Sequence, residues 1–534
     1  MRSESPKPLS LLLHALSVIE TQNASDPLWV QGIVDDARDV EPGDLFIAVR
    51  GHSVDGHDFV AEAVRRGASA VVVDRDGAYG VHVPVIRVPD TRRAVAELAA
   101  AWYEYPAKRL RLIGITGSFG KTATLNMLHA ILDRAGIRAG AIGSDFFGLR
   151  LADRLHERLL HTTPAPLELH GALARIVEAG GRVCAMEVTS QGLVQERVHG
   201  LEFALGIFTC IAPLEHGDYH GSFRRYVEAK ARFFDHILPG APLVFPLGDR
   251  AVCSLVEGLD VRHVGGGVGS RARVRIRNRR LEPERTRMVL EVRRPLPRVG
   301  GGRVEPVAIP IELRLLGRMN ARNAALAAAA GLCLGADPRA VREGLASVRP
   351  PPRRLELVHR GRFTVLDDAA THPEALNVLF DVVGGIRHRR LFLAAAIRGG
   401  RGPDFNRRYA ESLAIWSRLR PVHGVVVTSS EETVGDVDQV SPAEREAFLR
   451  ELRRAGVPHR HQARLDEAIQ SALGHVGDGD LLVLLGTQGM HAGPALVRRW
   501  LPVEGDAQQK STILPDPEAS PEASPGALPE TGAP

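Results

Sequence analysis

A glycine-rich turn between an apolar run and an amphipathic run is the feature that most constrains how this chain folds. The run Leu112–Thr116 predicts a strand, the stretch from Thr122 onward predicts a helix, and the residues between them read Gly117-Ser118-Phe119-Gly120-Lys121. Glycines let the backbone wrap a phosphate with N–H groups pointing inward, and the helix N-terminus adds a favourable partial charge. This succession predicts a nucleotide-binding α/β domain.

The last two residues of the turn carry its expected chemistry. Lys121 is expected to reach the β- and γ-phosphates, and the Thr122 hydroxyl is expected to bind Mg²⁺. The strict phosphate-loop pattern has a glycine where this chain has Ile115, so the turn is a shortened variant. A tight turn without a ligand is the alternative. The flanking strand and helix favour the nucleotide site.

The length of the chain predicts several domains. Its 534 residues correspond to about three domains at roughly 150 residues each. We expect an α/β protein with a small α/β N-terminal domain over residues 1–108, a central doubly wound sheet that carries the phosphate turn over 109–349, and a C-terminal Rossmann-like α/β domain over 350–505. Residues 506–534 are rich in Pro, Ala, Glu and Ser, which predicts a disordered tail.

Short apolar runs mark the strands expected in these domains. The stretch from 270 to 316 alternates charged and β-branched residues, which predicts exposed antiparallel strands added to the central sheet. The three prolines at 350–352 predict a stiff linker. The other runs expected to form strands are Leu45–Val49, Ala70–Val73, Val85–Val88, Leu112–Thr116, Val183–Val188, Leu205–Thr209, Phe363–Leu366, Leu391–Ala396, Val425–Thr428 and Leu481–Leu485.

Composition excludes several classes of protein. With 44% hydrophobic and 25% charged residues the chain is expected to fold, and a net charge of only +5 argues against a nucleic-acid partner. The four cysteines form no CxxC pair, which argues against a zinc site or a disulfide framework and fits a reducing cytosol. The apolar cluster Leu11–Leu13 is too short for a signal segment or a membrane span. A cytoplasmic protein without membrane insertion is therefore expected.

Several motifs, in order along the chain, resemble those of the Mur ligase family. The run Ile113–Thr122 (IGITGSFGKT) resembles the family's phosphate loop, and Glu187–Leu193 (EVTSQGL), followed by Arg197, is similar to its EVSSH element. The stretch from Phe208 to Phe234 resembles its DHLDYHG and Y..AK..LF elements. Later matches are Gly317–Asn323, Arg354–Glu356 and Asp367–Pro373, and His161–Pro164 resembles the NTTP element.

The resemblance covers about residues 30 to 500 and implies an activity. Elements in the first hundred residues, such as Pro42–Phe46 and Asp55–His57, are similar to the branch that extends UDP-N-acetylmuramoyl-dipeptide. The implied protein is an ATP- and Mg²⁺-dependent acid–amino-acid ligase of peptidoglycan precursor synthesis. It forms an acyl phosphate, releases ADP, and adds an amino acid to UDP-N-acetylmuramoyl-L-Ala-D-Glu. The resemblance also implies that the first domain holds the UDP part and that a single chain is active.

The resemblance assigns roles to particular residues, and one ligand has a physical reason of its own. Glu187 ends a predicted strand at the edge of the sheet, where a hard oxygen ligand for Mg²⁺ belongs. The implied catalytic residues are Lys121, His216 and Lys230, the last carbamylated in the family. The implied metal ligands are Thr122, Glu187, His216 and Lys230. The implied nucleotide contacts are Gly117, Ser118, Gly120, Lys121, Thr122, Asn320, Asn323, Arg354 and Asp368, and the implied donor contacts are Thr162, Thr163, Ser190, Gln191 and Arg197.

The chain also departs from the family pattern. Phe119 and Cys210 stand where asparagines are usual, and Gln191 replaces a histidine. The family's DNPR element, which reads diaminopimelate, is expected after Val425–Thr428, but residues 429–433 read SSEET and contain no arginine. A site without that arginine loses its bidentate grip on the acceptor's distal carboxylate. We therefore expect that diaminopimelate is not the acceptor.

Two other functions stay open at this stage. A ligase of the same fold that couples a different carboxylate and amine is favoured by the altered third domain, whereas the well-matched first domain disfavours it. A nucleotide-binding regulator without ligase activity is the other alternative. Phosphate release in the presence of donor and acceptor separates a ligase from a regulator.

Overall fold

The computed structural model describes residues 2–23, 27–51, 54–144, 148–151, 155–212, 221–282, 284–350 and 353–501. The chain divides into two compact units. The first comprises residues 1–355 and 377–387, and the second comprises 356–376 and 388–534. The prolines at 351 and 352 and the tail from residue 506 lie outside the described residues, so the linker and the disordered tail stay predictions.

A six-stranded sheet forms the N-terminal part of the first unit, in the order β1-β3-β4-β5-β6-β2. Strands β3 to β6 are parallel, and β1 and β2 pair antiparallel at the two edges. The strands are β1 (Arg2–Pro8), β2 (Glu20–Gln22), β3 (Trp29–Val34), β4 (Asp44–Ile47), β5 (Ala70–Val73) and β6 (Val85–Arg87), and the α-helices are α1 (Leu9–Leu13), α2 (Val60–Arg65) and α3 (Thr91–Trp102). The predicted small α/β arrangement is confirmed.

The central sheet of the first unit has eleven strands in the order β10-β9-β8-β11-β7-β12-β13-β14-β15-β16-β19. Strands β8 to β15 of this order run parallel, whereas β15, β16 and β19 pair antiparallel, as the alternating pattern of 270–316 predicts. The strands are β7 (Arg111–Thr116), β8 (Ala139–Gly143), β9 (Gly148–Leu151), β10 (Leu155–Arg158), β11 (Val183–Glu187), β12 (Phe203–Phe208), β13 (Pro242–Pro246), β14 (Arg262–Gly267), β15 (Val274–Leu281), β16 (Thr286–Val292) and β19 (Val307–Leu313).

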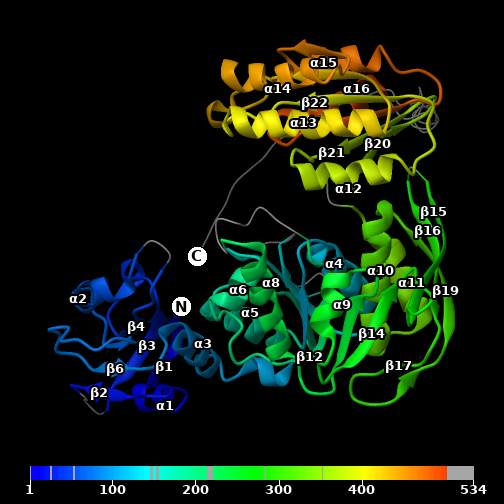
Figure 1. Cartoon of the computed structure of the whole chain (residues 1–534). Helices are drawn as coiled ribbons and strands as arrows, with labels where there is room; N and C mark the ends of the chain where they lie inside the picture. The colour runs from blue at the N-terminus through cyan, green and yellow to red at the C-terminus, as the bar shows by residue number, and fades with distance from the viewer. Residues whose placement is uncertain are drawn as a thin grey trace, which may run out of the picture. The chain divides into compact units, whose positions relative to one another are not determined.

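Helices cover both faces of this sheet, which explains why its strands are apolar on both sides (Figure 1). One apolar layer contains α4 (Lys121–Arg134), α10 (Gly317–Cys333) and α11 (Pro338–Ser347). The other contains α5 (Pro166–Glu178), α6 (Ser190–Val194) and α9 (Arg250–Val256), and α8 (Phe223–Ala231) lies next to α6. Helix α10 begins at Gly317, directly after the extended residue Leu316.

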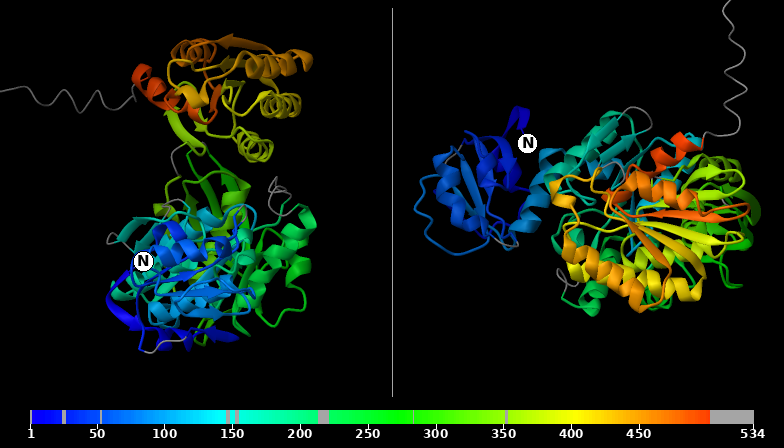
Figure 2. Two further views of the ribbon diagram at one scale, coloured as in Figure 1. Left: turned by 90° about the vertical axis from the view of Figure 1, so that its left-hand side faces the viewer. Right: turned by 90° about the horizontal axis from the view of Figure 1, so that it is seen from above.

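The second unit, coloured yellow-green to red, has helices on both sides of its sheet (Figure 2). The sheet has six strands in the order β20-β21-β25-β22-β23-β24. All neighbours except β20 and β21 are parallel, which confirms the Rossmann-like prediction. The strands are β20 (Glu356–Arg360), β21 (Thr364–Asp368), β22 (Leu391–Ala396), β23 (Val422–Thr428), β24 (His459–Gln462) and β25 (Leu481–Leu485), and the helices are α12 (Pro373–Val383, shared between the units), α13 (Pro403–Leu419), α14 (Pro442–Arg454), α15 (Leu465–Leu473) and α16 (Gly493–Trp500).

Among the described residues, no helix combines the length and the apolar composition that a membrane crossing requires.

Candidate active site

The phosphate turn has a backbone that only glycine accommodates at two positions. Gly117 has φ 140° and Gly120 has φ 83°, both in the region that side chains rarely adopt. A Cβ at Gly117 would overlap Thr209 Oγ1, and one at Gly120 would lie 2.7 Å from Asn323 Oδ1. The turn therefore fits closely between the end of β12 and helix α10, with the N-terminus of α4 opening onto it.

Side chains of the turn are anchored to the segment after β12 and to α8. The backbone N–H of Ser118 donates to the Cys210 carbonyl at 2.8 Å, and Ser118 Oγ lies 2.8 Å from Tyr226 Oη. The Phe119 N–H lies 3.4 Å from Cys210 Sγ. Cys210 Sγ thus lies against the backbone N–H and carbonyl of Phe119.

Lys121 is folded back over the turn that precedes it. Its Nζ donates to the carbonyls of Gly117 at 3.0 Å and Ser118 at 3.4 Å. Burial lowers the pKa of this ammonium, and the nearby Glu187 carboxylate acts in the opposite direction.

Asn323 is fully buried against Gly120, and neither amide atom has a hydrogen-bond partner within the described part of the chain. Buried amides are nearly always satisfied, so an orphaned one beside a phosphate turn indicates a position for a ligand. Asn320, one turn earlier, donates to the Leu316 carbonyl at 2.8 Å. Of the two predicted asparagines, Asn323 therefore has the stronger structural support.

A buried carboxylate lies beside the turn. Glu187 ends β11 with no exposed surface, and its Oε2 accepts a hydrogen bond from Thr122 Oγ1 at 3.0 Å. Its Oε1 accepts from the Ser144 N–H at 2.9 Å, and Ser144 Oγ lies 2.7 Å from Thr162 Oγ1. Two predicted metal ligands, Thr122 and Glu187, are thus brought together across 65 positions of sequence. Carboxylate and hydroxyl oxygens are the ligands that Mg²⁺ prefers.

The predicted donor contacts surround the same strand end. Thr163 Oγ1 donates to the Glu187 carbonyl at 3.0 Å, and Arg197 Nη1 donates to the Thr163 carbonyl at 2.7 Å. Ser190 opens α6 and is buried, whereas Gln191 beside it is exposed. The structure therefore brings Thr162, Thr163 and Arg197 together next to Glu187.

Lys230 lies on α8 with only 2% of its surface exposed. Its Nζ is 5.1 Å from the centre of the Tyr226 ring. Burial holds the pKa of this ammonium well below its ordinary value, and the positive charge of Lys121 lowers it further. The other predicted catalytic and metal-binding residue of this region, His216, lies outside the described residues.

The two remaining nucleotide contacts belong to different units. Arg354 is exposed at the end of the first unit. Asp368 ends β21 in the second unit, is buried, and its Oδ1 accepts from the Ala370 N–H at 2.8 Å. Since the two residues belong to different units, their joint contact with one nucleotide stays a prediction.

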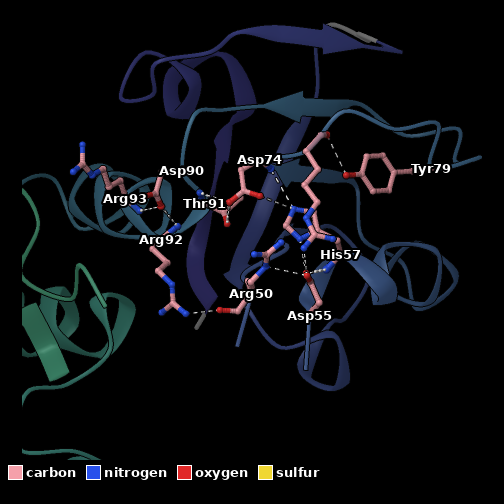
Figure 3. A network of polar contacts seen from close by, with 10 residues as sticks. Arg50, Asp55, His57, Asp74, Tyr79, Asp90, Thr91, Arg92 and Arg93 are labelled. Carbon is pink, nitrogen blue, oxygen red and sulfur yellow. Dashed lines mark hydrogen bonds and ion pairs between the residues drawn. The ribbon is translucent and has the colours of Figure 1, made fainter. Parts of the chain in front are cut away.

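A second polar network lies at the carboxyl edge of the N-terminal sheet (Figure 3). The buried His57 ring lies between Asp55 and Asp74: Nδ1 is 2.7 Å from Asp55 Oδ1, and Nε2 accepts from the Asp74 backbone N–H at 3.2 Å and lies 3.1 Å from Asp74 Oδ1. Asp74 Oδ2 also accepts from Thr91 Oγ1 at 2.8 Å. The network ties the loop after β4 to the end of β5 and to the first residue of α3. The element Asp55–His57 therefore has a structural role, because it holds these three segments of the N-terminal domain together.

Sequence reasoning gave no role to Ser144, Thr209 or Tyr226. Ser144 holds Glu187, Thr209 Oγ1 donates to the Thr116 carbonyl at 3.2 Å, and the Tyr226 hydroxyl lies against Ser118. Ser144 and Thr209 each follow a parallel strand directly, so the rule that ligands gather at carboxyl ends could have found them. Tyr226 carries no such signal, because only the packing of α8 brings its hydroxyl to the turn.

Comparison with known proteins agrees with this geometry. Family models match three successive parts of the chain: the Mur ligase family catalytic domain over residues 30–103, the Mur ligase middle domain over 115–331, and the Mur ligase glutamate ligase domain over 353–488. A UDP-N-acetylmuramoyl-L-alanyl-D-glutamate–2,6-diaminopimelate ligase of Geobacillus thermodenitrificans is 32% identical over 470 residues, 84% of this chain and 88% of the relative. The Chlorobaculum tepidum protein of the same name is 32% identical over 464 residues, 86% and 87% of the two chains.

Solved structures share the fold. A structure of a UDP-N-acetylmuramoyl-L-alanyl-D-glutamate–2,6-diaminopimelate ligase superposes with a TM-score of 0.67 at 21% identity and covers 91% of this chain and 94% of its own. MurF from Acinetobacter baumannii superposes with a TM-score of 0.59 at 20% identity, covering 93% and 98%.

A phosphate turn, an adjoining buried carboxylate and a Rossmann-like second unit define an ATP-dependent ligase that forms carbon–nitrogen bonds and releases ADP. The chain belongs to the Mur ligase family. Members of this family use ATP with Mg²⁺, and the residues around Gly117, Thr122 and Glu187 fit both.

Proposed function

We propose that this chain joins an amino acid to UDP-N-acetylmuramoyl-L-Ala-D-Glu, driven by ATP, in the synthesis of peptidoglycan precursors. Relatives with 32% identity carry this donor in their names. The observation that carries the proposal is the convergence at Glu187. Its side chain meets Thr122 of the phosphate turn, and its strand end meets the donor-side Thr162 and Thr163. A carboxylate donor and a triphosphate can therefore meet at one place.

The reaction has two steps. A carboxylate oxygen of the donor attacks the γ-phosphorus of ATP, and the bond from that phosphorus to the bridging oxygen of ADP breaks. The amine then attacks the acyl carbon, and inorganic phosphate and a proton leave. Since both first reactants are anions, positive charge must neutralise them, and orientation contributes up to roughly 7–11 kcal/mol.

We assign different residues of this chain to the phosphates, to the metal ion and to the donor. The turn and Lys121 bind the β- and γ-phosphates, and Thr122 with Glu187 holds Mg²⁺, which neutralises phosphate oxygens. Lys230 is buried, and burial lowers the pKa of its ammonium, which favours the neutral amine. Addition of that amine to CO2, with loss of a proton, would give a carbamate that serves as a further anionic ligand. We assign His216 to the same metal and Arg197 to the positioning of the donor through Thr163.

A cavity in the first unit offers room for the nucleotide base and ribose. It has a volume of about 1420 Å³ and is lined by the ends of β13 and β14, by α9 and by the first turns of α10. Met319 and Arg322 face it, while Asn323 on the same helix contacts Gly120. The cavity and the phosphate turn thus lie on neighbouring faces of one helix, as the two ends of ATP require.

The acceptor is proposed to differ from that of the named relatives. Residues 429–433 hold no arginine, and Glu432 is occupied in the fold, because its Oε1 accepts from the Leu465 and Asp466 N–H groups at 2.7 and 3.2 Å. Thr433 Oγ1 donates to the Ser430 carbonyl at 3.2 Å. A segment engaged in this way does not offer a cation to a second carboxylate, so diaminopimelate is not favoured.

Phosphate release tests the proposal. The full-length protein is mixed with ATP, Mg²⁺, UDP-N-acetylmuramoyl-L-Ala-D-Glu and one of diaminopimelate, lysine, ornithine or other amino acids. We expect release that requires both donor and acceptor, that is lost in Lys121→Ala and is kept in the control Lys108→Ala. ATP binding without release for any acceptor contradicts the ligase, and a clear preference for diaminopimelate contradicts the acceptor assignment.

We further propose that one chain is active and that it works in the cytoplasm. A single chain carries the phosphate turn, the donor contacts and the second unit. Light scattering of the active protein checks whether one chain is active, and a dimer as the only active species contradicts that proposal.

A further inference from the structure

The segment that follows α6 carries Arg197 and has an unusual backbone. Glu196 has φ 55°, a left-handed conformation that is unfavourable for a residue with a Cβ. Hydrogen bonds hold the backbone around it, since the Arg197 N–H donates to the Gly192 carbonyl at 2.9 Å and the His199 N–H donates to the Glu196 carbonyl at 3.1 Å. A residue keeps such a conformation where its surroundings hold it, and such residues gather at functional sites.

The Glu196 carboxylate lies among cationic side chains from three segments of the first unit. Its Oε1 lies 3.7 Å from Arg93 Nη2 on α3 and 3.8 Å from Arg232 Nη1, which opens the short helix η4 (Arg232–His236) after α8. Its Oε2 lies 3.6 Å from His199 Nδ1. The contact with His199, followed by the charge of Arg93, lowers the pKa of Glu196, so the carboxylate stays ionised.

His199 extends this cluster to a second residue of α3. Its Nε2 lies 3.3 Å from Glu97 Oε1, one helical turn after Arg93, and the preceding Val198 is fully buried in the apolar layer of α5 and α6. Helix α3 packs on the N-terminal sheet and also contacts α5 of the central sheet. The segment of Arg197 is therefore fixed to the N-terminal sheet through two side chains of one helix.

Two histidines lie near Glu196, and their surroundings favour different protonation states. His236 Nδ1 lies 3.1 Å from the Leu201 carbonyl, and burial lowers the pKa of this ring. The Glu196 carboxylate raises the pKa of His199, burial opposes the rise, and Glu97 adds to it. His199 is therefore the ring that carries a positive charge below its raised pKa and loses that charge as the pH rises.

We propose that Glu196 and His199 position Arg197 for the donor by fixing its segment to α3. The inference rests on the proposed ligase function, in which Arg197 holds Thr163 beside the donor through its carbonyl. The resemblance implies that the N-terminal sheet holds the UDP part, whereas Arg197 lies at the central sheet. Ion pairs between α3 and the segment of Arg197 keep both contacts at the spacing that one donor molecule requires. Glu196 and His199 act through Arg197, so they are positioning residues.

The pH dependence of the KM for the donor tests the role of His199. Loss of its proton removes one charge from the cluster, so the donor KM of the wild type should rise about two- to fivefold from about pH 6 to about pH 9. His199→Gln does not titrate in this range, and its donor KM should not show this rise. Phosphate release at saturating ATP and acceptor measures the donor KM, and the KM for ATP should not show the rise in either protein.

Two variants of Glu196 separate positioning from damage to the fold. Glu196→Gln removes the charge, and Glu196→Gly removes the carboxylate while it accepts the left-handed backbone without strain. Both should raise the donor KM about fivefold with the KM for ATP unchanged, and Glu196→Gly should keep a Tm close to that of the wild type. The control Glu202→Gln, at an exposed residue of the same unit, should keep the wild-type donor KM.

The outcomes distinguish this inference from the ligase proposal. A wild-type donor KM in both Glu196 variants, or the wild-type pH dependence in His199→Gln, overturns the inference while the ligase stands. If the wild type releases no phosphate with any acceptor, the ligase proposal fails, and calorimetric titration of the donor into the same proteins then takes the place of KM. Equal donor affinity of the wild type and both Glu196 variants in that titration also overturns the inference.

Discussion

Buried polar groups define the candidate site at the scale of single residues. Glu187 and Asn323 both have no exposed surface, yet Glu187 is engaged by Thr122 and Ser144 whereas the Asn323 amide has no partner in the described structure. A buried amide costs free energy unless it is hydrogen-bonded. Asn323 is therefore a position at which the fold gives up stability, and we propose that a nucleotide supplies the missing contacts.

Replacing Asn323 by alanine should weaken ATP binding without a matching loss of stability. No hydrogen bond of the free protein is broken, so we expect the free energy of unfolding without nucleotide to change by less than about 1 kcal/mol. The Kd for ATP should rise about tenfold, and the rise in Tm caused by ATP should shrink. Calorimetric titration and thermal melting measure both.

The control is Cys333→Ala, in the last turn of the same helix and fully buried. It should lower the Tm through lost packing and leave the affinity for ATP as it is. Equal affinity of wild type and Asn323→Ala for ATP contradicts the assignment of this residue.

Ends of helices and strands carry the chemistry at the scale of elements. Glu187 ends β11, the phosphate turn precedes α4, and Arg197 lies shortly after α6. Other charged residues near strand ends stabilise the fold instead. Glu432 accepts from the first N–H groups of α15, whose own preceding residue Arg464 provides no side-chain cap. The two kinds of residue look alike in the sequence.

Glu432→Ala should destabilise the second unit and leave acceptor recognition intact. Loss of a carboxylate cap at a helix N-terminus costs about 1 kcal/mol, so the midpoint of denaturant unfolding should fall. The KM for the acceptor should not change, because the carboxylate is engaged by α15. Denaturant titration and phosphate release measure the two effects. The neighbour Glu431→Ala, about half exposed, is the matched control and should leave the midpoint in place; a raised acceptor KM in Glu432→Ala alone argues for a direct contact.

The three large sheets follow one design at the scale of the whole molecule. Each is largely parallel, and each presents its polar network at the carboxyl ends of its strands: Asp74 in the N-terminal sheet, Glu187 in the central sheet and Arg398 in the second unit. Parallel strands are connected by helices that cover both faces, so the strand ends are the places left for polar side chains.

Stability of the whole chain should fall in mild acid through His170. This histidine of α5 is 2% exposed, its ring nitrogens have no partner among described residues, and burial lowers its pKa from 6.5 to about 4. The unfolded chain binds the proton first, so stability is full above pH 6.5, declines as pH falls toward 4, and loses about 3 kcal/mol in total. Unfolding of wild type and His170→Leu between pH 7 and 4 measures this.

The comparison rests on the slope with pH. His170→Leu should show a shallower decline than the wild type, and the exposed variant His14→Gln should retain the wild-type slope. Identical slopes for wild type and His170→Leu would mean that the ring accepts a proton in the folded state without cost.

The alternation of strands and helices could be predicted from the sequence because it depends on local pattern. The apolar runs at Val183 and Leu391 became β11 and β22, and the charged alternation after residue 270 became the antiparallel edge.

Residue contacts across long stretches of sequence could not be predicted in this way. Thr122 meets Glu187, Gly120 meets Asn323, and Ser118 meets Tyr226 only because the sheet order brings β7, β11, β12 and α10 together. The hydrogen bonds between Asn406 and the Arg398 backbone depend likewise on the packing of α13 beneath this loop.

By itself, the sequence determined that a phosphate turn stands between a strand and a helix and that the second unit lacks the expected arginine, since both are properties of neighbouring residues. Only the tertiary structure decided which buried groups are satisfied. Burial and atoms from distant segments decide whether the Asn323 amide has a hydrogen-bond partner and whether Glu432 caps a helix. They also decide which charged groups lie near Arg398.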